Sequence, residues 1–222
     1  MKQITQTLLC ILLGVFVSVT ALCSTVSDQQ WQDITDRLRA LEHCQDTNSC
    51  PQDPSSPRNS FYLLGEEINQ ELDRVAQWQR DFGSNAESRA LLHHFLKYQN
   101  EFVQEKVLTI LREMPADDDT VAELLALLPD VRDKRVLIPL LIQLQRYPKM
   151  QSQVDKAFAQ VLERGSFEAG KVLAQHIQPF LGAENLAFYQ QLHSQLPPQS
   201  AKARALAKAI AREKSKQARR EG

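Results

Sequence analysis

The chain has 222 residues, of which 43% are hydrophobic and 24% charged, and its formal net charge is −1. This is the balance of a soluble globular protein. No nucleic-acid-binding motif is present, so no nucleic-acid partner is expected. Only seven glycines occur, against a large stock of Ala, Leu, Gln, Glu, Lys and Arg. Because these are strong helix formers, the composition predicts an all-α protein with a single core or a short repeat array.

The first 23 residues are interpreted as a signal peptide. The stretch from Leu8 to Leu22 carries no charge, but it is shorter than the roughly 20 residues that span a bilayer. Small residues stand at the positions that a signal peptidase requires, which predicts cleavage after Ala21 or after Cys23. Two alternatives remain open: Cys23 carries a lipid, as in bacterial lipoproteins, or the segment is retained as a membrane anchor. The protein is predicted to be periplasmic or secreted, and the alternative is attachment to the membrane by a lipid on Cys23.

Cysteine usage agrees with export. Outside the signal region only Cys44 and Cys50 remain, and two cysteines this close in an oxidising compartment predict a local disulfide. The alternative adds His43 to make a metal site, but three ligands fall short of a closed zinc set.

Two helices are expected before the repeats. In residues 24–60, Ser27 or Asp28 begins a helix with one apolar face that ends by Cys44, and a loop rich in Pro and Ser follows over residues 45–60. A second helix spans residues 61–82, with Gly83 and Ser84 as its stop.

From residue 84 onward the sequence contains internal similarity. Four segments align, 85–116, 117–149, 150–182 and 183–215, and each has two apolar helical stretches separated by a short break. Basic–apolar–Leu triplets begin at Lys106, Arg135, Lys171 and Arg204. Such pairs cannot bury their apolar faces alone, so residues 61–215 are predicted to form a helical repeat domain, a short α-solenoid of about four hairpins, followed by a basic tail over residues 216–222.

The second segment contains LLALLPDVRDKRVLIPLLIQL, with a Leu-rich helix, Asp130 at the turn, and a basic–apolar pair opening the next helix. This pattern resembles a HEAT-like repeat; the resemblance covers about residues 84–215 and is specific only in this segment. The third and fourth segments lack the matching aspartate, and all four are shorter than typical HEAT repeats. The resemblance implies stacked hairpins with an extended binding surface, and the alternative is an irregular helical bundle.

No residue pattern indicates catalysis, a cofactor or a metal, so the protein is not expected to be an enzyme. Adjacent His93 and His94 point about 100° apart on a helix and cannot share a metal, which predicts one in the hairpin interface and one in solvent. Asp117, Asp118 and Asp119 are expected to cap a helix rather than bind a cation. The four basic triplet residues are expected to pair with carboxylates of neighbouring hairpins.

The preferred function is therefore a protein-interaction scaffold or adaptor whose partner is another envelope protein. Its contact residues are expected at the starts of the second helices, at Arg132, Lys134, Glu168 and Lys202. The alternative is a structural factor that docks on anionic membrane or polymer through Lys202–Arg220, where eight Lys or Arg residues meet few acids.

Overall fold

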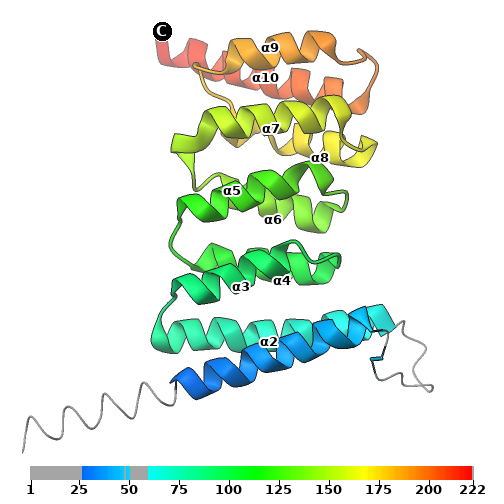
Figure 1. Cartoon of the computed structure of the whole chain (residues 1–222). Helices are drawn as coiled ribbons and strands as arrows, with labels where there is room; N and C mark the ends of the chain where they lie inside the picture. The colour runs from blue at the N-terminus through cyan, green and yellow to red at the C-terminus, as the bar shows by residue number, and fades with distance from the viewer. Residues whose placement is uncertain (1–26, 48, 51–59, 222) are drawn as a thin grey trace, which may run out of the picture. The chain divides into compact units, whose positions relative to one another are not determined.

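The computed structural model describes residues 27–47, 49–50 and 60–221, and within these ranges the regular structure is helical, with no strand (Figure 1). The all-α prediction is confirmed for this part of the chain. The predicted signal segment with Cys23, and residues 51–59 of the predicted loop, lie outside the described residues. Two compact units are formed, Met1–Arg89 and Ala90–Gly222.

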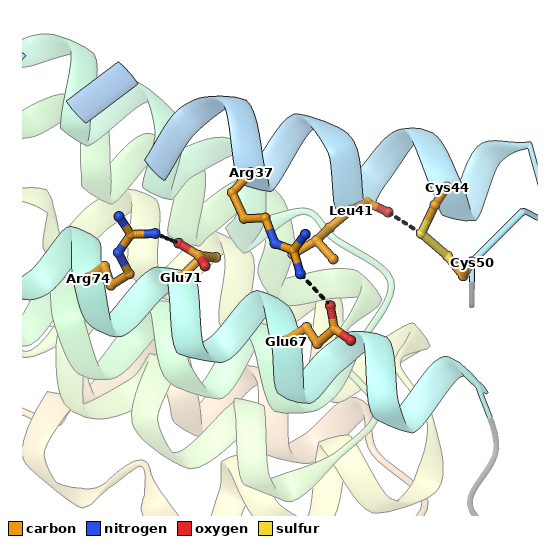
Figure 2. Close-up of polar contacts among 7 residues, drawn as sticks. All are labelled: Arg37, Leu41, Cys44, Cys50, Glu67, Glu71 and Arg74. Atoms are coloured by element: carbon orange, nitrogen blue, oxygen red, sulfur yellow. Dashed lines mark hydrogen bonds and ion pairs between the residues drawn. A yellow bond between two sulfur atoms is a disulfide. The ribbon is translucent and has the colours of Figure 1, made fainter. Parts of the chain in front are cut away.

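The first unit pairs a helix over residues 27–46 with α2, Ser60–Phe82. The rings of Trp31 and Trp78 lie 4.8 Å apart, and Arg37 forms an ion pair of 3.2 Å with Glu67 (Figure 2). Because Trp31 precedes Arg37 whereas Trp78 follows Glu67, the helices run antiparallel. Most apolar residues predicted from the periodicity are buried, among them Ile34, Leu38, Leu41, Ile68, Leu72 and Val75. Phe82, which the same pattern includes at the end of α2, is instead 42% exposed.

Both ends of this helix pair match the sequence prediction closely. Gly83 ends α2 with a φ of 87°, a left-handed conformation that glycine adopts without strain, and its N–H donates to the Gln79 carbonyl at 2.9 Å. At the other end the first helix continues just past Cys44. Cys44 and Cys50 form the disulfide that their spacing predicts (Figure 2).

Each of the four aligned segments contains one pair of helices. Helix α3, Ala86–Leu96, begins in the first unit and ends in the second. The helices that follow are α4 (Glu101–Glu113), α5 (Asp118–Leu127), α6 (Lys134–Leu144), α7 (Gln151–Arg164), α8 (Phe167–His176), α9 (Leu186–Gln195) and α10 (Ala201–Glu221), with 3-10 turns Leu128–Asp130, Pro148–Met150 and Gln178–Phe180. Residues 216–221, which the sequence assigns to a basic tail, belong to α10.

The second helices of the pairs pack in chain order: α4 contacts α6, α6 contacts α8, and α8 contacts α10. Figure 1 shows the pairs α5–α6, α7–α8 and α9–α10 layered within this unit. Successive second helices begin at Glu101, Lys134, Phe167 and Ala201. Their starting points are therefore almost evenly spaced along the sequence.

Two rows of buried side chains follow this spacing without interruption. One row consists of Val107, Leu140, Leu173 and Leu206, each 0% exposed, and the other of Leu111, Leu144, Ile177 and Ile210, none more than 7% exposed. Within each row the members recur at a constant interval, the same in both rows. Each hairpin therefore supplies the same two positions to one continuous core, which fixes the second helices relative to one another within this unit.

Candidate interaction surface

The four predicted contact residues all lie where the second helices begin. Arg132 is in the turn before α6, Lys134 is the first residue of α6, and Glu168 and Lys202 are the second residues of α8 and α10. Arg146, just after α6, bonds to a carbonyl near the end of α4, and Arg135 near the start of α6 lies over the Phe102 ring near the start of α4. These two helices therefore run parallel and start at the same edge.

The four side chains differ in the hydrogen bonds and ion pairs that they form. Arg132 and Lys134 are exposed and have no hydrogen bond or ion pair with the described residues. Glu168 lies 3.4 Å from Lys171 on its own helix. Lys202 instead donates to the Leu162 carbonyl at the end of α7, so it closes a helix end. Arg132 and Lys134 are therefore the pair best placed to meet a partner.

A groove of about 740 Å³ crosses two consecutive hairpin turns, the one between α3 and α4 and the one between α5 and α6. Its apolar lining comes from Ala126, Leu127, Val131 and Val136, and its polar lining from Lys97, Gln99, Asn100, Glu101, Gln104, Asp130, Arg132 and Asp133. Arg132 is the predicted contact residue that lines it. No local sequence pattern marks the others, because they come together only when two turns are stacked.

The turns beside this groove are held by helix caps. The buried Asn100 side chain accepts from the backbone N–H of Phe102 at 3.0 Å, which caps α4. Gln104 donates to the Leu96 carbonyl at 3.1 Å and so closes the end of α3. Asp133 caps α6 by accepting from the Arg135 N–H at 2.8 Å. Each cap satisfies a backbone group that the helix leaves unpaired.

Arg135 joins the starts of two neighbouring second helices. Its guanidinium donates to Asp133 at 2.6 Å and lies 4.5 Å from the centre of the Phe102 ring on α4. The hydrogen bond from this guanidinium lowers the pKa of the Asp133 carboxyl below its ordinary value. Asp133 is therefore an ionised hydrogen-bond acceptor at neutral pH. Sequence reasoning expected Arg135 to pair with a carboxylate of a neighbouring hairpin, whereas its carboxylate partner belongs to its own hairpin.

The other polar predictions concern the α3 and α5 helices. Asp117 caps α5 by accepting from the Thr120 N–H at 2.9 Å, as expected for the aspartate run. His93 contacts Thr120 of the next hairpin at 2.9 Å, and His94 is exposed. The prediction of one interfacial and one exposed histidine is confirmed.

A buried polar cluster that the sequence did not indicate connects the third and fourth hairpins. The carboxylate of Asp155 on α7 accepts from Tyr189 at 2.6 Å, from Asn185 at 3.1 Å and from Gln151 at 2.8 Å. Asp155 is 8% exposed and Tyr189 0%. Burial, followed by the hydrogen bond to Asp155, raises the pKa of the Tyr189 hydroxyl well above its ordinary value. The cluster is largely buried and links α7 to the fourth hairpin.

Nothing among protein-family models, curated proteins or solved structures matches this chain. Across the residues that the structure describes, no helix has both the length and the apolar character needed to cross a membrane. Nor do three or more His, Cys, Asp or Glu side chains gather anywhere in those ranges as ligands for a metal ion.

Proposed function

We propose that this protein is an exported scaffold whose helical pairs form a short, HEAT-like α-solenoid and bind another protein of the cell envelope. The observation that carries the proposal is the groove across the α3–α4 and α5–α6 turns. It combines apolar lining residues, fixed polar groups and an exposed Arg132 without an ion-pair partner in the described chain. Protein-binding surfaces use this combination.

Two observations support the repeat interpretation. Second helices start at nearly equal intervals along the chain, and buried side chains recur at one constant interval through all four pairs. Stacked repeats place equivalent loops along one edge, and such edges are used for binding. We therefore place the partner along the edge where α4 and α6 begin.

The compartment rests on the segment 1–23 and on the disulfide. An uncharged run from Leu8 to Leu22 has the length of a signal-peptide core. The Cys44–Cys50 disulfide fits an oxidising environment outside the cytoplasm. We propose the periplasm, with cleavage near Cys23 or lipid attachment to it.

Binding is preferred to catalysis because of the charges in the groove. Asp133 is held ionised by Arg135, and Lys97 pairs with Glu123 at 2.7 Å. A general acid or base needs a pKa tuned toward neutrality, and the lowered pKa of Asp133 lies in the opposite direction. A carboxylate held in its charged form, such as that of Asp133, suits recognition.

Site-specific photo-crosslinking in the native envelope tests this proposal. A photoreactive residue is placed at Arg132 or Lys134, and a control at Lys156, which is exposed on α7. We expect one discrete protein adduct from positions 132 and 134 and none from 156. The double variant R132A/K134A should then reduce recovery of that protein at least fivefold, whereas K156A/R164A, which removes the same charge from α7, should not. Equal recovery with both double variants would contradict the proposed surface.

The second candidate, docking of α10 on an anionic membrane, must use charge alone. The apolar residues that an interfacial helix would insert, Leu206 and Ile210, are buried in the protein core at 0% and 7% exposure. Removing the chain after Ser200 would therefore open the core as well as remove the cations. Substitution of exposed cations is the sharper test.

A further inference from the structure

A second groove, of about 350 Å³, runs between α8 and α10. One wall carries Arg204, Lys208 and Arg212 from α10, the other carries Gln175 from α8 and Gln178 from the turn after it, and alanines complete the lining. The described residues that line it include no acidic side chain. The groove is therefore a positively charged channel with amide groups on the wall opposite the cations.

The three cations are not used by the fold. Arg204, Lys208 and Arg212 are exposed, and none of them forms a hydrogen bond or ion pair with the described residues. Two other cations of α10 are engaged: Lys202 donates to the Leu162 carbonyl, and Lys216 lies 3.4 Å from the buried Glu213. Lys214, Arg219 and Arg220 lie outside the groove lining. Charge that stabilises no helix end and no carboxylate is available for a ligand.

The spacing of these cations along α10 indicates which ligand conformation would match them. Residues four apart on a helix are separated by about 6 Å along its axis. In an extended peptide, alternate side chains point to one side and repeat every ~6.6 Å. A peptide with an acidic residue at every second position would thus present carboxylates in step with Arg204, Lys208 and Arg212.

The same groove is less suited to a helix or to a membrane. A helix is about 10 Å wide with its side chains, which is large for a channel of about 350 Å³. A bilayer is flat and would not reach amides on the opposite wall. Gln175, which is exposed, can instead bond to the backbone of an extended chain.

We propose that the α8–α10 groove binds an extended acidic polypeptide segment, with acidic residues at alternate positions. Arg204, Lys208 and Arg212 receive its carboxylates, and Gln175 holds its backbone. The inference gives the proposed scaffold a second surface and names its ligand class, and it rests on different residues from those around Arg132. Failure at one surface is therefore distinguishable from failure at the other.

The test uses the mature chain and a fluorescent peptide of six Glu–Ser pairs, in which Glu alternates with Ser. We expect saturable binding that weakens with added salt, since the contacts are ionic. The variant R204Q/K208Q/R212Q should lose at least tenfold in affinity. The matched variant K214Q/R219Q/R220Q removes the same charge from α10 outside the groove lining and should lose less than threefold. Q175A should weaken binding while leaving the salt dependence intact.

Three controls decide against alternatives. The side chains changed in the triple variant are exposed, so its helicity and melting temperature should match those of the parent. Equal losses in both triple variants would show only general attraction to α10 and would overturn the proposal. So would equal binding of a Gln–Ser peptide, or of a peptide with the same Glu and Ser residues in two blocks. Binding to phosphatidylglycerol vesicles that depends on the groove cations, without peptide binding, would assign the surface to membrane instead.

Discussion

The guanidinium of Arg146, just after α6, donates a hydrogen bond of 2.9 Å to the main-chain carbonyl of Leu111, near the end of α4. Gln143 donates to the same carbonyl at 3.1 Å, and Arg146 also donates to the Met114 carbonyl. The last carbonyls of a helix have no partner within it. Side chains at the end of one hairpin thus provide hydrogen bonds to the unpaired carbonyls at the end of the hairpin before it. These bonds fix the packing of the two helices in addition to the contacts of the buried apolar rows.

Removing this cap should destabilise the fold. In R146A the carbonyls of Leu111 and Met114 lose charge-assisted bonds, so we expect the free energy of unfolding to fall by about 1–3 kcal/mol. Urea unfolding followed by circular dichroism at pH 7 measures it. R164A, at an exposed position at the end of α7, should change stability by less than about 0.5 kcal/mol. Similar losses in the two variants would show that the cap adds little.

We expect the effects of substituting Asp155 and Tyr189 on the free energy of unfolding to depend on each other, because the two side chains share a buried hydrogen bond. Y189F leaves the carboxylate of a buried aspartate with fewer donors, and we expect a loss of about 1.5–3 kcal/mol. In a D155N background, where the carboxylate charge is absent, Y189F should cost less, with a coupling energy of at least about 1 kcal/mol. A double-mutant cycle by chemical denaturation measures the coupling. Additive effects would mean that the two groups contribute separately.

Alkaline pH should weaken the protein through the same tyrosine. The pKa of Tyr189 is raised in the folded state above its ordinary value of 10.0, so the folded state keeps a proton that the unfolded state releases. Its contribution is complete below pH 10 and decreases as pH rises above it, by up to about 1.4 kcal/mol per pH unit. Unfolding free energies at pH 9, 10 and 11 should fall less steeply for Y189F than for the parent. Parallel curves would exclude Tyr189 as the cause.

Much of the architecture is readable from the chain because it is local. Local sequence signals predict the first helix with its apolar face from Trp31 to Leu41, the stop of α2 at Gly83, and the four paired segments. The basic triplets align the four segments less accurately, because the spacings between successive triplets are uneven. Those residues lie at different turns of their helices, because surface positions tolerate such shifts. The buried rows, which packing constrains, keep a constant spacing.

The polar sites were not predictable in the same way. Arg146 and Leu111 are 35 residues apart in sequence, and Asp155 and Tyr189 are 34. Nothing in either local segment marks such a partner, since the contact depends on how one hairpin stacks on the next. The same holds for both grooves, whose walls come from different hairpins. Arg132 was predicted as a contact residue from its position at the start of a second helix, and it is exposed and lines the first groove.

The uninterrupted core row makes a sharp prediction for α6. Leu140 is 0% exposed and occupies the shared position between Val107 and Leu173, whereas Ile142 on the same helix is 42% exposed. L140A should leave a cavity in the row and lower the free energy of unfolding by about 2–5 kcal/mol. I142A removes a side chain of the same size from the surface and should lower it by less than about 1 kcal/mol. Urea denaturation of both variants, with native-state hydrogen exchange on α4 and α8, measures the difference. Because Leu140 links the neighbouring helices, its loss should also weaken protection of amides in α4 and α8, and a loss confined to α6 would contradict a continuous core.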